Sequence, residues 1–433
     1  MNYHYITLLI IINLLIMFKK MSNLKRGDCT MTYLQKGTKE FKLANLALFA
    51  AGFIIFANLY ITQPLLPQFS EEFHVSPAIA SLSLSLSTIV LSVSLIFFGS
   101  LSEAWGRKRL MTISIFAASI LTIALAFSPS FEMLLLLRMA QGFVFAGVPA
   151  IAMAYLGEEV DPSSLGVAMG LYISGNSVGG LAGRIIMGTM TDLFSWQIGM
   201  IVLGLLSLVV SAYFVWALPE SKHFHPRPLK IKSLTQSLIS HLKDPGLVCL
   251  FGIAFTLMGA FVTLYNYIGY KLVGPPYNLS AGIVGSIFIV YLVGTFSSAW
   301  FGSLSDKFGR QKVLFSGIFI MFTGALLTLP ESLIIKIVGI IIFTFGFFGS
   351  HSIASGWVSF RATKDKAQAS SLYLFAYYFG SSIGGTTGGI FWNNFGWSGV
   401  IGFISAFLIT TISLTVTLMM LNRKAAFENH LQY

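Results

Sequence analysis

Long apolar runs separated by short polar stretches follow one another along nearly the whole chain. From residue 41 onward each run is long enough to cross a bilayer as a helix, which takes about 20 residues. One run opens with alternating serine and leucine from Ser81 to Ser87, a period that alone would suggest a strand. The run continues apolar to Phe98, and a lone strand in lipid would leave its backbone unsatisfied, so we predict a helix. Twelve spans are predicted, at residues 43–66, 78–100, 110–128, 132–155, 166–189, 196–218, 247–270, 280–303, 312–330, 333–357, 368–391 and 396–421.

The composition agrees with this pattern. Of the 433 residues, 55% are hydrophobic and only 10% are charged, whereas a soluble domain carries about 25% charged residues. An ordinary soluble protein is therefore excluded. A stretch rich in proline and basic residues divides the spans into two sets of six. The predicted organisation is an N-terminal tail at 1–42, a six-helix half at 43–218, a linker at 219–246, a second half at 247–421 and a C-terminal tail at 422–433.

The N-terminal tail contains a shorter apolar segment at residues 5–18, followed by Lys19 and Lys20. A signal peptide would carry its positive charges before the apolar core and a small-residue cleavage site after it, and neither is present. Two interpretations remain open. The segment is upstream sequence ahead of a start at Met21 or Met31, or it is an additional interfacial segment.

Basic residues are distributed unevenly. If the N-terminus lies inside the cell, 23 of the 27 lysines and arginines fall on the inner side, which is the bias expected of cytoplasmic segments. Lys271 and Lys336 fall outside, and Arg138 and Arg184 lie within spans. We therefore expect both termini to be cytoplasmic in a multi-pass protein of the cell (plasma or inner) membrane. The net charge of +11 then reflects topology, and no nucleic-acid partner is expected.

A charged hairpin occurs twice between apolar runs. The stretch 99–109 is echoed by 302–312, which indicates an internal duplication. The matching positions share one offset of 203 residues: Gly99 with Gly302, Leu101 with Leu304, Glu103 with Asp306, Gly106 with Gly309, and Arg107 with Arg310.

This hairpin resembles the signature of the major facilitator superfamily, Gly-x-Leu-x-Asp-x-x-Gly-Arg-(Lys/Arg) between spans 2 and 3, with a weaker copy between spans 8 and 9. The chain departs from it at Ala104, where the family usually has arginine. The resemblance implies an all-α integral membrane protein with twelve transmembrane helices in two pseudo-symmetric six-helix halves. It also implies that the hairpins act as conformational switches, with Glu103 and Arg107 in a clamp between the halves. Candidate partners of Arg107 are Glu158, Glu159 and Asp161.

Glycines repeat in span 5 and span 11. Small residues at this spacing let two helices approach closely, and we expect span 5 to pack in this way against span 8 or span 1. The glycine-rich span 5 also resembles that of proton-driven antiporters of the superfamily, which ends in Gly-Pro-x-x-Gly-Gly. Here Gly175-Asn176 replaces Gly-Pro, so the match is partial. The repeated glycines are Gly175, Gly179 and Gly183, matching Gly380, Gly384 and Gly388.

Ionisable residues within the spans are few, which makes each a candidate functional residue. By resemblance, Arg138 belongs to an Arg-x-x-x-Gly element whose arginine faces the central cavity and takes part in proton coupling, with Gln141 on the same face. The alternative is that Arg138 snorkels to the outer surface. Arg184 ends a stripe that begins at Asn176. His351 could titrate near neutral pH or serve as a hydrogen-bonded packing residue.

The resemblance in the placing of spans 1, 4, 7 and 10 also indicates residues that line a substrate cavity. Asn58 and Tyr60 are two residues apart on one helix, so at most one of them is expected to point straight into that cavity. The candidates are Asn58, Tyr60, Gln63, Tyr265 and Asn266, with Asn176 and Tyr378 from spans 5 and 11.

Several chemistries have no support in the sequence. No grouping of nucleophile and base, no P-loop and no metal-spaced set of ligands is visible, so we expect neither an enzyme nor a metal site or other cofactor. No Asp or Glu lies in the middle of a span. A transporter dedicated to cations would be expected to bury a carboxylate, so the two arginines favour neutral, zwitterionic or anionic solutes.

These features together predict a secondary active transporter of small organic solutes that works by alternating access. By resemblance it is closest to the twelve-span drug and metabolite efflux branch, with protons as the coupling ion. The alternative is uptake by a proton symporter or a facilitator. Its expected partners are a small-molecule substrate and the lipid bilayer, and it is expected to be a monomer.

Overall fold

The structure is a computed structural model that describes residues 33–224 and 231–430. The apolar segment predicted at residues 5–18 lies outside the described residues. Within them, apart from an isolated bridge between Leu34 and Val160, the regular structure is helical, as predicted.

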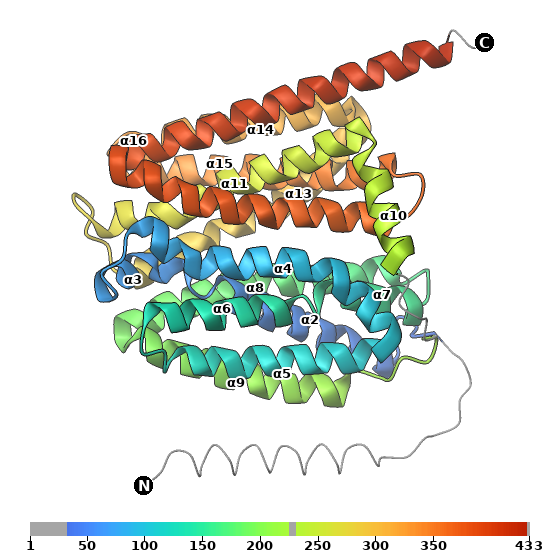
Figure 1. Cartoon of the computed structure of the whole chain (residues 1–433), viewed down its shortest axis with the longest axis horizontal. Coiled ribbons are helices and arrows are strands. Elements are labelled where there is room, and N and C mark those ends of the chain that lie inside the picture. Colours follow the sequence, from blue (N-terminus) through green and yellow to red (C-terminus); the bar gives the residue numbers. More distant parts are fainter. Residues whose placement is uncertain (1–32, 225–230, 431–433) are drawn as a thin grey trace. The chain divides into compact units, whose positions relative to one another are not determined.

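The helices form two groups joined by α10 (Figure 1). We call α2–α9 the first bundle and α11–α16 the second bundle. The first contains α2 (Lys39–Tyr60), η1 (Gln63–Leu65), α3 (Leu66–Glu72), α4 (Pro77–Trp105), α5 (Arg107–Leu125), α6 (Phe131–Phe145), α7 (Pro149–Glu159), α8 (Leu165–Leu193) and α9 (Trp196–Ala217). After α10 (Ile231–Leu242), the second contains α11 (Pro245–Val273), α12 (Ala281–Ser286), η2 (Ile287–Val290), α13 (Tyr291–Phe308), α14 (Arg310–Leu327), α15 (Leu333–Arg361) and α16 (Lys366–His430).

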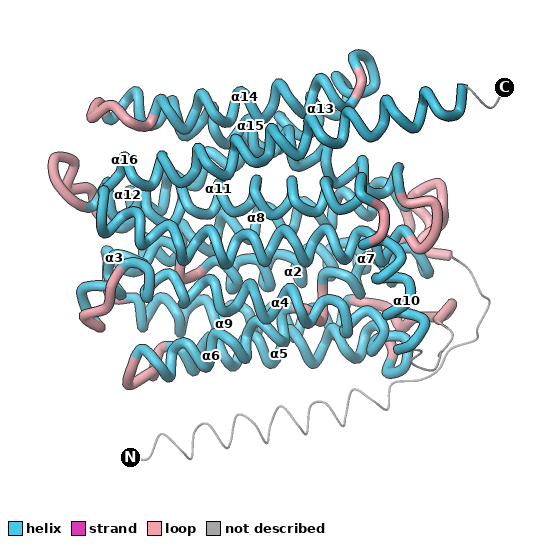
Figure 2. The backbone as a smooth tube through the Cα atoms, turned by 45° about the horizontal axis from the view of Figure 1, so that its top comes forward, coloured by secondary structure: helices cyan, strands magenta, loops and turns pink. Residues whose placement is uncertain are grey.

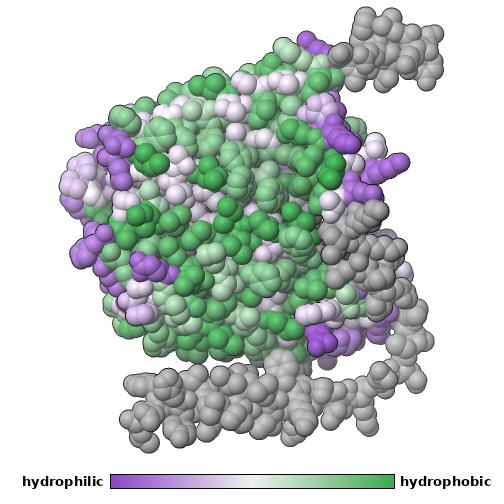
Figure 3. Space-filling model, in the orientation of Figure 1, coloured by the Kyte–Doolittle hydropathy of each residue, from purple (hydrophilic) through white to green (hydrophobic). Residues whose placement is uncertain are grey.

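Loops gather at the two ends of these helices (Figure 2). Apolar residues cover the visible face between the ends, and hydrophilic residues collect at the ends themselves (Figure 3). This is the distribution expected of a protein whose helices cross a bilayer. We call the end that carries α10 the linker end and the other the far end.

Ten helical stretches in the described residues are long and apolar enough to cross a membrane. One of them, Gln368–Arg423, contains a break at Gly396 and covers two predicted spans. The 29-residue helix α8 is not among the ten, because its many glycines make it less apolar. The predicted number of twelve spans therefore stays a prediction.

Three spans predicted as continuous helices are interrupted. The chain leaves α2 after Tyr60 and continues through η1, where Pro64 lies, and α6 and α7 are separated just before Pro149. Proline has no N–H and its ring clashes with the preceding turn, so a helix breaks there. The span predicted at 280–303 is also divided, into α12, η2 and α13.

Two regions predicted as non-spanning contain additional helix. The linker includes α10, and α16 continues to His430, beyond the predicted end of the last span at residue 421. Alanine, lysine, arginine and glutamate, all good helix formers, follow that point.

The alternating serines of α4 lie in a continuous helix, so the helix prediction is confirmed. Their spacing has a structural reason, because α4 packs against α6 of its own bundle on one face and against α16 of the second bundle on another, and needs small side chains on both. The Ser87 hydroxyl donates to the Arg138 carbonyl of α6, at 2.7 Å. On the other face, Ser382 of α16 donates to the Ser85 carbonyl, at 2.8 Å.

The duplicated hairpins have the same backbone turn. Gly106 has φ 94° and ψ 141°, and Gly309 has φ 85° and ψ 142°. Residues other than glycine rarely adopt this positive φ, so each glycine allows one helix to end and the next to begin within a single residue. The internal duplication is thus visible in the backbone.

The repeated glycines form two helix contacts. Gly175, Gly179 and Gly183 of α8 lie against the backbone carbonyls of Phe49, Phe53 and Ala57 in α2, where an added Cβ would overlap each carbonyl. In the second bundle, Gly380 and Gly384 of α16 lie in the same way against the backbone of α11 at Phe255 and Gly259. Close contact of this kind is how helices associate in lipid.

We expect Gly179→Ala to lower the free energy of unfolding by about 1–3 kcal/mol, because the new methyl group would overlap the backbone of α2 at Phe53 and force the two helices apart. Gly170→Ala is the matched control. It lies on the same helix with nothing within 4 Å of its added Cβ, and alanine favours helix there by up to about 1 kcal/mol. Thermal unfolding in detergent measures both. Equal melting temperatures for the two variants would contradict the packing role.

Candidate functional site

The two bundles contact each other nearer the far end. The helix pairs that join them are α4 with α16, α8 with α12, and α3 with α11. In the described residues, the hydrogen bonds between the bundles involve the far-end portions of these helices. They include those that join Gln63 to Asn266 (2.8 Å), Ser70 to Tyr270 (2.7 Å), Asp192 to the Gly282 N–H (2.7 Å) and Thr88 to Ser382 (2.7 Å).

Arg184 of α8 lies in this contact surface and is 2% exposed. Its guanidinium lies over three aromatic rings: Tyr60 of the first bundle at 4.0 Å, and Phe288 and Tyr291 of the second at 4.6 and 4.9 Å. It also donates to the Gly180 carbonyl at 2.6 Å. In the described part of the chain it forms no salt bridge. The buried charge is therefore held by rings and neutral oxygens from both bundles.

Gln63 connects Arg184 to the second bundle. It accepts a hydrogen bond from the Arg184 Nε at 2.7 Å and donates one to the Asn266 Oδ1 at 2.8 Å. The amide nitrogen of Asn266 is buried and has no partner within the described residues. The hydroxyls of Tyr265 and Thr344 share a hydrogen bond of 2.7 Å, and the Tyr265 ring stacks on Phe288. We call Tyr60, Gln63, Arg184, Tyr265, Asn266, Phe288 and Tyr291 the interface cluster.

A row of aromatic rings runs from the interface cluster to His351. Phe261 contacts Tyr265 and Tyr291 on one side and stacks on Phe347 at 3.8 Å on the other. Phe347 in turn lies parallel to the His351 ring. The Nδ1 of His351 is 2.9 Å from the Tyr373 hydroxyl. A continuous row of ring contacts thus links the Arg184 guanidinium to the His351 imidazole.

Two other cavity candidates lie beside this region. Asn176 packs over Gly52 together with Tyr172, and its Oδ1 and the Tyr172 hydroxyl are both buried. Tyr378 is nearly buried and its ring meets Tyr377 edge-on.

Arg138 lies within the first bundle and is fully buried. Its guanidinium donates to the carbonyls of Asn58 (3.0 Å), Leu59 (2.6 Å) and Ser83 (2.6 Å), and to the Gln141 side chain (2.6 Å). In this conformation it is therefore fixed to the end of α2 and to α4, and its charge is stabilised by backbone oxygens.

A polar network continues from Arg138. Gln141 donates to Thr122 at 2.8 Å, Thr122 donates to the Asn58 Oδ1 at 2.6 Å, and Asn58 donates to Ser207 at 3.0 Å. Asn58 therefore points into the first bundle, whereas Tyr60 points to Arg184. The two residues face different environments, as their spacing requires.

The two hairpins differ in their partners. Arg107 forms a two-point salt bridge with Glu158 of α7, with distances of 2.7 and 3.2 Å, and also donates to Ser102. Arg310 instead lies over the Phe360 ring at 4.0 Å. Glu103 and Asp306 form no salt bridge in the described residues, so the clamp between the halves stays a prediction.

Three side chains have contacts that the sequence alone does not indicate. Phe288 and Tyr291 are distant in sequence from Arg184, and no local pattern distinguishes them. Lys336, which the sequence predicts on the outer side of the membrane, is buried at the far end of the second bundle. It donates to the Thr328 carbonyl at the end of α14 and lies 5.5 Å from the Trp397 ring. A lysine at a helix C-terminus compensates the partial negative charge there.

No cluster of three metal-ligating side chains occurs in the described residues.

Two helical bundles with a contact surface between them are an architecture that many secondary transporters share. The family model of the Major Facilitator Superfamily matches residues 48–367 and 273–429. The chain is 54% identical over 385 residues to the uncharacterized MFS-type transporter YybF of Bacillus subtilis (strain 168), covering 89% of this chain and 95% of that protein. It is 45% identical over 380 residues to the inner membrane transport protein YnfM of Escherichia coli (strain K12), covering 88% and 91%. The chain belongs to the Major Facilitator Superfamily.

The fold is also shared with solved structures. A crystal structure of a bacterial homolog to human lysosomal transporter Spinster, in an inward-facing and unoccupied conformation, matches with a TM-score of 0.70 at 15% identity, covering 89% of this chain and 96% of that one. The predicted all-α membrane fold of this superfamily is confirmed. The protein is a transporter and not an enzyme, and transporters of its family generally need no cofactor.

The Arg138 geometry generates a stability prediction. In Arg138→Lys the positive charge remains, but one ammonium cannot reach the carbonyls of α2 and α4 together. We expect the free energy of unfolding to fall by about 1–3 kcal/mol. Arg109→Lys, at an exposed position, is the control and should leave the melting temperature unchanged. If the two variants melt alike in detergent, Arg138 does not hold these helices together.

Proposed function

We propose that this transporter exports small organic anions or zwitterions from the cell in exchange for protons, by alternating access. The solute would bind between the bundles at the interface cluster. Proton-coupled export also fits the resemblance of the glycine-rich α8 to the antiporter branch, although Asn176 departs from that pattern.

The observation that carries the proposal is the surroundings of Arg184. A cation buried between two bundles, whose partners among the described residues are aromatic rings and neutral oxygens, can accept a carboxylate or another anion without first breaking a salt bridge. The unpartnered Asn266 amide offers a second donor nearby. Both donors suit an anionic group.

Two features support the orientation and the transport cycle. The described basic residues of both hairpins and of the linker lie at the linker end, which favours a cytoplasmic position for that end. The hydrogen bonds between the bundles lie toward the far end. An arrangement closed at one end is what one state of an alternating-access cycle requires. Arg138 and Gln141 would then keep the end of α2 rigid as the bundles rotate.

The experiment uses everted membrane vesicles with an acidic lumen. Organic anions, zwitterions, sugars and permanent cations are added in turn, and lumen alkalinisation is followed. We expect anions or zwitterions to alkalinise the lumen. We expect Arg184→Gln to raise their KM by about tenfold to a hundredfold, the effect of losing a hydrogen bond between charged groups. Arg184→Lys, which keeps the positive charge, should retain more of the affinity than Arg184→Gln.

Arg109→Gln is the control, since it also removes a positive charge but lies at an exposed hairpin position. Alkalinisation by permanent cations at a rate undiminished in Arg184→Gln would contradict the proposed substrate class. Solute accumulation in whole cells, with no alkalinisation of everted vesicles, would reverse the direction and make the protein a symporter or facilitator for uptake.

His351 is the proposed site of protonation, because it is the histidine at the end of the row of aromatic rings and it is hydrogen-bonded to Tyr373. We expect His351→Gln to abolish transport driven by a pH gradient while substrate exchange across the membrane at equal pH continues. Tyr373→Phe, which retains the imidazole, should shift the pH profile without abolishing coupling. Gradient-driven transport that survives in His351→Gln would assign protonation to another group.

A further inference from the structure

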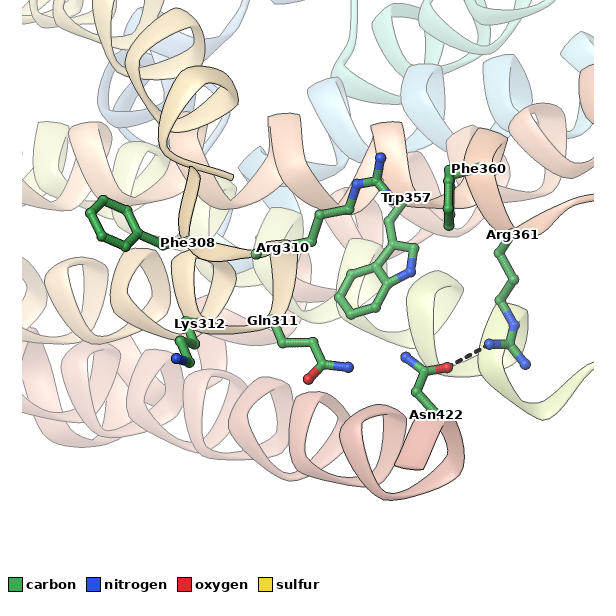
Figure 4. A pocket seen from close by; sticks show the side chains of 9 residues that line it. Phe308, Arg310, Gln311, Lys312, Trp357, Phe360, Arg361 and Asn422 are labelled. Atoms are coloured by element: carbon green, nitrogen blue, oxygen red, sulfur yellow. Dashed lines mark hydrogen bonds between the residues drawn. The ribbon is translucent and has the colours of Figure 1, made fainter. Parts of the chain in front are cut away.

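A pocket of about 380 Å³ lies at the linker end of the second bundle, away from the interface cluster. Three elements meet there: the hairpin between α13 and α14, the last turns of α15, and the part of α16 near Asn422 (Figure 4). It is lined by Phe308, Gly309, Arg310, Gln311, Lys312, Trp357, Phe360, Arg361 and Asn422.

The lining carries positive charge without a carboxylate of its own. Arg310 and Lys312 form no salt bridge in the described residues. In the first bundle the equivalent arginine, Arg107, is neutralised by Glu158. The two halves match at offsets of 203 to 205 residues, at which Glu158 corresponds to Arg361, Ala362 or Thr363, and none of these is acidic. The second copy thus has the arginine without the acidic partner.

Backbone donors add to this charge. Gly309 precedes α14 and has no side chain that could cap it. The N–H groups of the first turn, at Arg310, Gln311 and Lys312, therefore have no partner within the helix. These three residues line the pocket. A helix N-terminus with adjacent basic side chains is suited to a phosphate group.

Arg361 forms a fixed wall of the pocket. Its guanidinium contacts Asp244 at 2.8 Å and donates to the Asn422 Oδ1 at 2.8 Å. Although partial burial opposes ionisation, the hydrogen bonds from Arg361 and from the Gly246 N–H hold the pKa of Asp244 below its usual value. Asp244 therefore stays ionised and neutralises Arg361, and the unbalanced charge belongs to Arg310 and Lys312.

Large apolar side chains surround this polar centre. Phe308 and Phe360 are 54% and 68% exposed, and Trp357 also lines the pocket. Exposed aromatic residues at the end of membrane helices contact the boundary between headgroups and acyl chains. The pocket therefore matches an amphiphile better than a small soluble anion.

We propose that this pocket binds the phosphate headgroup of an anionic phospholipid from the adjacent leaflet. Arg310, Lys312 and the first turn of α14 would hold the phosphate, and Phe308 and Phe360 would contact the acyl chains. A bound lipid would join the hairpin to the ends of α15 and α16. The site is separate from solute transport, and only the identity of the leaflet depends on the proposed orientation.

The test is native mass spectrometry of the full chain in detergent, with added phosphatidylglycerol or phosphatidylcholine of matched acyl chains. We expect one phosphatidylglycerol to be retained in preference to phosphatidylcholine. The double variant Arg310→Gln/Lys312→Gln should weaken this binding about thirtyfold, or roughly fivefold for each charge removed. Asn422→Asp, a change of almost equal size that adds a negative charge to the lining, should weaken it too.

Arg109→Gln is the matched control, because Arg109 occupies in the first hairpin the position of Lys312 in the second. It should leave lipid retention unchanged, and size-exclusion profiles verify that every variant is folded. Equal retention of the two lipids, or unchanged retention in both pocket variants, would overturn the proposal. Displacement of the lipid by millimolar inorganic phosphate would assign the pocket to a soluble phosphate compound instead.

Discussion

A charge inside a bilayer has to find its partners within the protein, and two arginines determine much of how this chain is arranged. Arg138 is bonded to backbone carbonyls and a glutamine within one bundle, which fixes three helices to one another. Arg184 is placed between the bundles, where each desolvated ring contact contributes up to about 2 kcal/mol. The first arrangement is complete within one bundle. The second needs groups from both bundles, so in the proposed transport cycle it changes when the bundles separate.

The internal duplication shows which features the backbone dictates and which the side chains can change. Gly106 and Gly309 have nearly the same dihedral angles, because a one-residue turn between two spans leaves little alternative. The arginines that follow them differ entirely in environment. Arg107 is paired with Glu158, and Arg310 lies over Phe360 beside a pocket. The second copy has no carboxylate at the place of Glu158, and among the described residues its arginine forms no salt bridge.

The helices, the hairpins and the family could be predicted from the sequence, because apolar run length, repeated glycines and a spaced motif are local signals. The breaks before Pro149 and around Pro64 follow from proline chemistry but are hidden when hydropathy is averaged over a run. The interface cluster could be predicted only in part. Gln63, Arg184 and Asn266 stand out in the sequence as polar residues in apolar surroundings. Phe288 and Tyr291 resemble any other residue of an apolar run until the fold brings them to Arg184.

The central claim is that the bundles alternate about the contact surface that carries Arg184. Spin-label distances measured by electron paramagnetic resonance test it most directly, with labels on introduced cysteines after replacement of the two native ones. One pair, at Phe194 and Ile334, reports the far end, and a second pair, at Arg109 and Lys364, reports the linker end. Addition of a transported solute or a pH change should lengthen the first distance while the second shortens. Distances that stay fixed, or that change in the same direction at both ends, would contradict alternating access.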